Sequence, residues 1–421
     1  MTARAACDEC LRRTALIAAL APWLDVEWRR RSAPSRVLSL PDDALVALDG
    51  SGRVARAHAA FSPDRARERI AAAGLTAACR CTDGYPGRLL ELPDPPAVLH
   101  IAGHSDALDQ TDSVAIVGAR RGTSYGLEVS RSLGRGLTAA GVPVVSGMAM
   151  GVDSAAHVGA LEATAPPAAA ATGSADPAAA APGPGAAGSA DPAAAPPGPR
   201  AAGSADHGAG GHAVPARTAP ARAAPVAVLA GAADVPYPSS RRRLHAQLVE
   251  RGCVVSELPP GFTAYRWCFV ARNRLIAGLA ALTVVVEATE RSGSLTTADF
   301  AAQLGRPVAA VPGPITSRFS AGTNMLLASG AGVVRDTRDV LDQLLGPSAP
   351  APEDLPPPIP IEPRLRRLLD AIERGAGSLA ELTSDPEATR EVLQDLTDLE
   401  LRGLVRREFG GRYVRALEER R

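Results

Sequence analysis

The sequence predicts an α/β fold with a doubly wound parallel sheet. From Ser113 onward, short apolar runs alternate with helical patterns, as in sheets that carry helices on both faces. The runs show no polar alternation, which is typical of strands buried on both sides. The expected strands are Val114–Val117, Val142–Val145, Val226–Leu229, Val254–Ser256, Leu282–Val286, Val308–Val311 and Gly332–Val334.

Two other regions flank this sheet domain, which we place at residues 106–346. Residues 1–105 have helical spacing of apolar residues, and we interpret their aromatic side chains as core and not as a platform for stacking bases. A Pro-rich linker at 347–360 leads to residues 361–421, where two amphipathic helices precede a hairpin pattern. That order predicts a winged-helix domain.

The helix that would enter a DNA groove in such a domain is acidic. It carries Asp385, Glu387, Glu391, Asp395, Asp398 and Glu400 against Arg390 and Arg402. A groove-reading helix needs the opposite charge, so we interpret this domain as an interaction module and not as a transcription factor.

A segment of Ala, Pro, Gly, Ser and Asp interrupts the sheet domain at about residues 164–225. The tetrapeptide GSAD begins at Gly173, Gly188 and Gly203, so the segment repeats every 15 residues. Its few large apolar side chains cannot offset the entropy cost of ordering, and we expect a disordered insertion between a helix and the next strand.

Composition narrows the function classes. The 421 residues include 45 basic and 45 acidic side chains, so no global excess of charge favours nucleic acid or membrane binding. All 45 basic residues are arginines, whose planar guanidinium suits phosphate contacts and base stacking. No apolar stretch predicts a transmembrane helix or signal peptide, so we expect a cytoplasmic protein without a membrane partner.

Six cysteines include two close pairs, Cys7 with Cys10 and Cys79 with Cys81. Such spacings are compatible with zinc, but no histidine stands at a usual offset from either pair. We therefore expect reduced thiols, and neither a metal nor another cofactor.

The most informative stretch is Phe269–Ala302. A buried-strand pattern, Leu282–Val286, precedes a Gly/Ser turn at Ser292–Leu295 and a helix that Thr296 or Thr297 can cap. Ligands of parallel sheets bind beyond the carboxyl ends of the strands, where free NH groups at helix N-termini attract anions. This stretch therefore predicts a phosphate site.

Two more strand ends carry glycines. Val117–Gly126 reads VGARRGTSYG, and Ser146–His157 reads SGMAMGVDSAAH. Glycine allows a phosphate to approach the backbone and arginine supplies charge, but the pattern is not GxGxxG and predicts no dinucleotide site. Asp153 is expected to cap the next helix and His157 to pack inside it, ahead of roles as a base or a catalytic group.

The densest basic cluster of this domain is Arg241–Arg243, at the start of a predicted helix. By itself it suggests a solvated surface, although positive charge there opposes the helix dipole and would suit a bound polyanion. Glu257 and Glu287 are possible acid or base groups, yet no nucleophile, metal set or catalytic triad accompanies them.

Together these motifs resemble the DNA-processing protein A family, DprA or Smf. The resemblance rests on VGARRGTSYG, SGMAMGVDSAAH, Tyr237-Pro238, Ser256-Glu257, ARNRLIAGL at 271–279, VVVEATERSGSLTTA at 284–298, VPG at 311–313 and GTNMLLASGA at 322–331. It covers about residues 85–345 apart from the insertion.

The resemblance implies an extended Rossmann-like domain, with an N-terminal domain of SAM or helix-hairpin-helix type. It implies a dimer without catalytic turnover that binds single-stranded DNA and loads the RecA recombinase in DNA uptake, natural transformation (competence) and recombination. The implied DNA-binding residues are Gly118, Arg120, Arg121, Ser146, Gly147, Arg241, Arg272, Asn273, Arg274, Ser292, Gly293, Ser294 and Thr296.

An enzyme is the alternative. Phosphoribohydrolases that cleave nucleoside monophosphates have a similar fold, with a PGGxGTxxE motif at the matching turn. Here that turn reads SGSLTTADF, without the glycine pair or the glutamate, which weighs against hydrolysis.

Overall fold

The computed structural model describes residues 6–31, 35–164, 223–347, 362–373, 376–383, 385–401, 404–407 and 411–415. The predicted Ala/Pro/Gly insertion, apart from its two ends, and the predicted Pro-rich linker after residue 347 lie outside these ranges.

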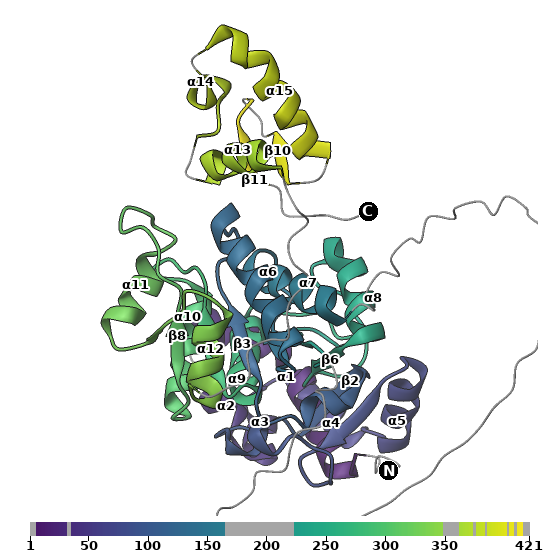
Figure 1. Ribbon diagram of the computed structural model, residues 1–421. Coiled ribbons are helices and arrows are strands. Elements are labelled where there is room, and N and C mark those ends of the chain that lie inside the picture. The colour runs from purple at the N-terminus through teal and green to yellow at the C-terminus, as the bar shows by residue number, and fades with distance from the viewer. Residues whose placement is uncertain are drawn as a thin grey trace, which may run out of the picture. The chain divides into compact units, whose positions relative to one another are not determined.

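A nine-stranded sheet in the order β1-β2-β6-β5-β4-β3-β7-β8-β9 forms the centre of the protein (Figure 1). Strands β3 to β9 all run parallel, whereas β2 is antiparallel to both β1 and β6. The strands are β1 (Thr76–Cys79), β2 (Val98–Gly103), β3 (Val114–Val117), β4 (Val144–Ser146), β5 (Val226–Val228), β6 (Cys253–Ser256), β7 (Leu282–Val285), β8 (Val308–Ala310) and β9 (Gly332–Val333). This confirms the predicted α/β class with a mostly parallel sheet.

The seven strands that the sequence predicts are all present, with ends that differ by one or two residues. The largest shift is in β4, which begins after Pro143, because a proline cannot donate a ladder hydrogen bond. Every residue of β3, β4 and β7 is buried, as the apolar runs predict for strands covered on both faces.

Residues 1–105 were expected to be helical, and that expectation is wrong for β1 and β2. β2 pairs with β6, His100 standing opposite Ser256, and β1 then pairs with β2. The alanine-rich sequence TAAC of β1 has little intrinsic strand preference, so its conformation comes from this long-range pairing. The sheet therefore begins about thirty residues before the predicted boundary at residue 105.

Helices cover both faces of the sheet. Ala115 and Val117 of β3 pack towards α9 and α10, while Val114 and Ile116 pack towards α6, α7 and α12. The helices of this part are α6 (Ser124–Ala139), α7 (Val152–Thr164), α8 (Arg242–Arg251), α9 (Arg266–Leu279), α10 (Gly293–Gln303), α11 (Ala321–Ala328) and α12 (Thr337–Leu345).

Five helices precede the sheet: α1 (Asp8–Arg31), α2 (Ser35–Leu38), α3 (Asp42–Ala47), α4 (Arg53–Ala59) and α5 (Pro63–Ala72). Leu16, Leu20 and Leu45 form a core with Trp267 of α9, which is 1% exposed. The carboxylate of Asp25 on α1 also accepts a 3.0 Å hydrogen bond from the backbone N–H of Arg266. The N-terminal helices thus support α9, the helix that carries the predicted DNA-binding arginines.

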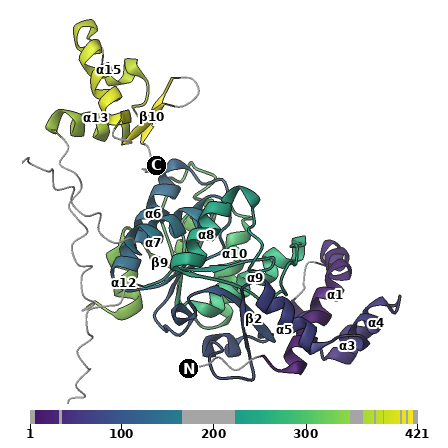
Figure 2. The same cartoon turned by 90° about the vertical axis from the view of Figure 1, so that its right-hand side faces the viewer.

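The C-terminal residues form α13 (Pro363–Glu373), α14 (Leu379–Leu382), α15 (Pro386–Leu401), β10 (Val405–Arg407) and β11 (Tyr413–Arg415) (Figure 2). Strands β10 and β11 pair antiparallel, which confirms the predicted hairpin pairing. Leu365, Leu369, Leu396 and Leu399 form their apolar core with Val405. Across the described residues, no helix has both the length and the apolar character needed to span a membrane.

Candidate nucleic-acid interface

The predicted site lies where the parallel strands end. The loops after β3, β4 and β7 leave the same edge of the sheet, because neighbouring parallel strands share their direction. Three helices begin at these loops: α6, capped by Thr123, α7, which begins at Val152, and α10, capped by Ser292. The expectation that Thr296 or Thr297 caps α10 is wrong, since both lie inside the helix.

The residue that caps α6, Thr123, binds the carboxyl group of Glu287. Its Oε2 accepts a 2.8 Å hydrogen bond from the backbone N–H of Thr123, and Oε1 accepts another from the Thr123 hydroxyl. A Cβ on Gly126 would come within 2.4 Å of this carboxylate, so a glycine is needed there. Glu287 is only 3% exposed, and it therefore fills the position that a phosphate would take at α6.

Close packing at the ends of β3 and β4 requires the small residues Gly118, Ser146 and Gly147. A Cβ on Gly118 would lie 2.8 Å from Val152, and one on Gly147 would lie 2.3 Å from the guanidinium of Arg272. The hydroxyl of Ser146 donates a 2.6 Å hydrogen bond to the carbonyl of Ile116. These contacts explain the small residues without a ligand.

Arg272 joins the ends of two strands. Its Nη1 donates to the carbonyl of Gly147 at 2.8 Å and also to the carbonyl of Val228. Burial lowers the pKa of Arg272 to about 10, and the nearby positive charge of Arg120 acts in the same direction, opposed by Asp153. Arg272 thus stays protonated at neutral pH and adds a fixed positive charge beneath the surface.

Asn273 fixes the start of α10. Its Nδ2 donates to the carbonyl of Gly293 at 3.1 Å and to the hydroxyl of Thr296 at 2.8 Å. The Ser292 and Ser294 hydroxyls lie 2.7 Å apart and bond to each other. Gly293 remains exposed, with open space where a Cβ would point. Of this turn, Gly293 is the residue whose backbone a ligand can approach.

Arg274 is an internal ionic tie. Its Nε donates to Asp94 at 2.9 Å, and Nη1 and Nη2 donate to the two carboxylate oxygens of Glu257 at 2.8 and 2.7 Å. The side chain is 3% exposed, and the two carboxylates strongly raise the pKa of its guanidinium. Arg274 was expected to form part of the wall of a DNA pocket. Its contacts instead lie inside the protein, where its side chain is buried.

The exposed part of the edge combines charge with aromatic rings. The guanidinium of Arg120 lies 5.2 Å from the centre of the Phe269 ring, and the Tyr237 ring lies 5.1 Å from that of Phe269. Arg120 and Tyr237 are exposed, and Tyr237 keeps 47% of its surface accessible. We call Arg120, Phe269 and Tyr237 the edge stack.

The sequence arguments did not select either ring of the edge stack as a site residue. A usable signal was present, because each ring stands within a few residues of a predicted arginine: Phe269 before Arg272, and Tyr237 before Arg241. Arg121 is exposed and Arg241 half-buried, so both predicted arginines reach the surface.

Asp153 stabilises the loop after β4, and His157 packs in the buried core. Helix α7 begins at Val152, so the expectation that Asp153 is its N-cap is wrong. The Asp153 carboxylate instead accepts a 3.1 Å hydrogen bond from the N–H of Gly147, and burial raises its pKa. His157 is fully buried, and burial lowers its pKa to about 4. The His157 side chain is therefore inaccessible to a substrate in solution, which speaks against a catalytic role.

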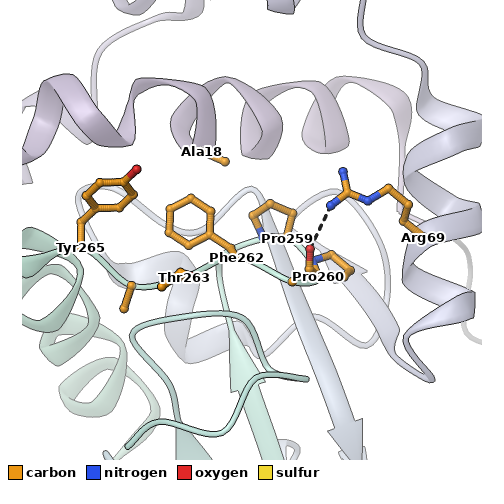
Figure 3. Close-up of a pocket in the computed structure, with 9 residues that line it drawn as sticks. Ala18, Arg69, Pro259, Pro260, Phe262, Thr263 and Tyr265 are labelled. Atoms are coloured by element: carbon orange, nitrogen blue, oxygen red, sulfur yellow. Dashed lines mark hydrogen bonds between the residues drawn. The ribbon is translucent and has the colours of Figure 1, made fainter. Parts of the chain in front are cut away.

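A hollow of about 600 Å³ lies between α1, α5 and residues 259–265 (Figure 3). The Arg69 guanidinium donates to the carbonyl of Pro260 at 3.0 Å, while the rings of Phe262 and Tyr265 lie 5.9 Å apart along the floor. Its lining contains no carboxylate, cysteine or histidine, so it offers no set of groups for acid-base or nucleophilic chemistry.

Comparison with known proteins finds a family whose sequence model matches the part of the chain that forms this edge. The model of the family "DNA recombination-mediator protein A" matches residues 76–179 and 210–345. The Smf protein of Escherichia coli is 30% identical over 79% of this chain and 75% of its own length. A DNA processing protein DprA of Mycobacterium tuberculosis is 35% identical over 55% of this chain, an alignment that spans 44% of the relative.

Among solved structures, DprA from Streptococcus pneumoniae superposes with a TM-score of 0.54 at 24% sequence identity. The match covers 80% of this chain and 96% of the other. This likeness supports the fold described above.

Proposed function

Because this chain belongs to the DNA recombination-mediator protein A family, DprA or Smf, we propose that it binds single-stranded DNA along the edge where its parallel strands end. In this proposal the protein is a non-enzymatic mediator that loads the RecA recombinase onto the bound strand and acts as a homodimer. Its cellular role would be recombination, including the uptake of DNA in natural transformation.

The edge stack is the observation that most supports the proposal. An exposed guanidinium beside two aromatic rings offers a charge for a phosphate and a flat surface for a base. Single strands are bound by this combination, because every base has a face that can stack and every nucleotide carries a phosphate.

The predicted site residues divide into two roles. Arg120, Arg121, Arg241 and Gly293 reach the surface and are proposed as DNA contacts. The other predicted residues hold those contacts in place through the packing and hydrogen bonds described above: Gly118, Ser146, Gly147, Arg272, Asn273, Arg274, Ser292, Ser294 and Thr296.

We also propose that residues 361–421 form a winged-helix module that contacts a protein partner. Asp395 of α15 lies 3.4 Å from Arg364 of α13, and α15 has a predominantly acidic sequence. A negative helix repels a DNA backbone, which favours a basic protein surface as its partner.

The phosphoribohydrolase alternative has no observation in its favour. Glu287, the buried carboxyl group of the loop after β7, is hydrogen-bonded to Thr123, the N-cap residue of α6, and Ser292 caps α10. A hydrolase would need a carboxylate that is free to act on the substrate.

The test is a titration of the full chain with labelled oligo-dT, followed by fluorescence anisotropy at two salt concentrations. Arg120→Ala is compared with Arg135→Ala. Arg120 precedes α6, whereas Arg135 is an exposed arginine on α6, about 16 Å along the helix from its first residue. Arg120→Ala removes the proposed phosphate contact, and because a hydrogen bond to a charged group contributes about 1.5–3 kcal/mol, it should weaken binding about 10- to 150-fold. It should also reduce the magnitude of the salt slope by about 0.7.

Arg135→Ala should bind like the wild type. Equal affinities for both variants would remove the edge stack from the binding site, and release of base from nucleoside monophosphates without DNA binding would support the enzyme instead. A RecA pull-down with and without residues 361–421 tests the partner role of the C-terminal module.

A further inference from the structure

Four cysteines from distant parts of the chain come together beside the first strand. Cys7 precedes α1 and Cys10 lies in its first turn, while Cys79 ends β1 and Cys81 follows it. The sulfur atoms of all four lie within 4.8 Å of one another. The sequence alone favoured free thiols because each pair lacked a nearby histidine, but the fold supplies each pair with the other.

The spacing of the sulfur atoms suits a tetrahedral metal ion. A Zn–S bond of about 2.3 Å places the sulfurs of a four-thiolate site about 3.8 Å apart. Cys10 Sγ and Cys81 Sγ are 3.6 Å apart, and the cluster as a whole needs only small side-chain shifts to close on an ion. Neither pair is joined by a disulfide.

The backbone around the cluster is arranged to stabilise thiolates. The N–H of Cys7 donates to the sulfur of Cys79 at 3.4 Å. A neutral thiol is a weak acceptor, whereas a metal-bound thiolate gains from amide N–H donors in its second shell. The positive end of α1 faces the same group, because Cys7 and Cys10 stand at its N-terminus.

We propose that Cys7, Cys10, Cys79 and Cys81 bind one zinc ion. Four thiols coordinate the ion and release their four protons to solvent, which leaves a site with a net charge of −2. All four coordination positions are then filled by protein, so the zinc is structural and has no open position for a substrate.

The site fastens the N-terminal helices to the sheet. Cys10 and Leu11 of α1 pack in one apolar cluster with Ile70 of α5 and Val98 of β2. Zinc adds a link between α1 and the end of β1 to this packing. The link is separate from the edge stack, because three strand spacings, about 14 Å, separate β1 from β5, which precedes Tyr237, and five separate it from β3, which precedes Arg120.

Metal analysis of the full chain tests the proposal. Protein is purified under reducing conditions from cells grown with added zinc, and metals are measured by mass spectrometry. We expect about one zinc per chain. The double variant Cys10→Ser, Cys79→Ser should contain none, while Cys253→Ser and Cys268→Ser, buried cysteines outside the cluster, should keep it.

Cobalt provides a readout that does not depend on any variant. Replacement of zinc by Co²⁺ in the wild-type chain should give the intense red-region d–d absorption and the near-ultraviolet charge-transfer bands of a tetrahedral four-thiolate site. Wild-type protein with no bound zinc and six titratable thiols would overturn the proposal. So would bound iron with inorganic sulfide, a disulfide within the cluster, or full zinc content in the double variant.

Discussion

Replacement of Arg274 by alanine separates a structural arginine from a DNA-binding one. The substitution leaves Asp94, 7% exposed, and Glu257, whose side chain is 10% exposed, as two buried carboxylates without their counter-charge. It also removes the hydrogen bonds that Arg274 donates to the carbonyls of Asp94 and Ala271. Removing one partner of a buried ion pair costs about 3–5 kcal/mol, and we expect a loss of that size in the free energy of unfolding.

The assay is urea unfolding followed by tryptophan fluorescence, because Trp23, Trp28 and Trp267 all lie in or against the core that α9 shares with the N-terminal helices. With an m-value of about 3 kcal/mol/M, the midpoint should fall by about 1 to 1.7 M. Arg120→Ala, an exposed substitution, should change stability by less than about 0.5 kcal/mol while it weakens DNA binding.

A triple variant provides the control. Arg274→Met with Asp94→Asn and Glu257→Gln removes every charge of the tie at once, so no uncompensated carboxylate remains and at least half of the lost stability should return. The reasoning fails if Arg274→Ala unfolds within about 1 kcal/mol of the wild type but loses oligo-dT affinity as Arg120→Ala does. In that case the guanidinium contacts DNA and the tie is dispensable.

Three other predictions concern two buried histidines and two glycines of the sheet domain. The pKa values of His100 and His157 are lowered to about 4 by burial, so as pH falls from about 6.5 towards 4 the unfolded chain takes up protons that the folded chain does not. Each histidine should cost about 2 kcal/mol of unfolding free energy between pH 7 and pH 5, and His157→Leu should remove its share without changing oligo-dT affinity. Gly126→Ala should lower the unfolding free energy by about 1–3 kcal/mol because its methyl group displaces Glu287; an unchanged urea midpoint would contradict that contact. Gly293→Ala should change the free energy of unfolding by less than about 0.5 kcal/mol but weaken oligo-dT binding, and unaltered affinity would show that DNA does not approach this backbone.

The strand pattern was predictable because a strand that is buried on both faces consists of consecutive apolar residues. VAIV in β3 and LTVV in β7 are typical of inner strands, and Gly118 marks the end of β3. β1 shows no such apolar run, since its side chains are one threonine, two alanines and a cysteine, and its partner residues in β2 stand 19 to 25 residues away. Its place follows from tertiary pairing, which local sequence does not encode.

The roles of the arginines show the same limit. Residues 271–280, which include Arg272 and Arg274, are buried on all sides, so no polar stripe distinguishes an internal arginine from a surface one. The partner carboxylates of Arg274 stand 180 and 17 residues away, and only the fold reveals that they meet. The sequence located the edge at which the parallel strands end, but it did not tell which of its arginines are buried and which are exposed.

The cysteine pairs illustrate a third case. Each pair was judged by its own neighbours, although 69 residues separate Cys10 from Cys79. The antiparallel pairing of β1 with β2 and the packing of α1 on this end of the sheet bring the pairs together. A ligand set that is split between two distant segments is apparent only once the segments are placed.

The place where the chain leaves and re-enters the sheet domain around residues 165–222 has a practical consequence. α7 starts at the carboxyl edge and runs back to Thr164, and β5, parallel to β4, starts from the opposite edge at Val226. Both junctions therefore lie across the sheet from the edge stack. A fluorophore attached at Thr164 or Ala223 themselves therefore sits on the far side of the sheet from the proposed DNA path, where it can report on binding without blocking it.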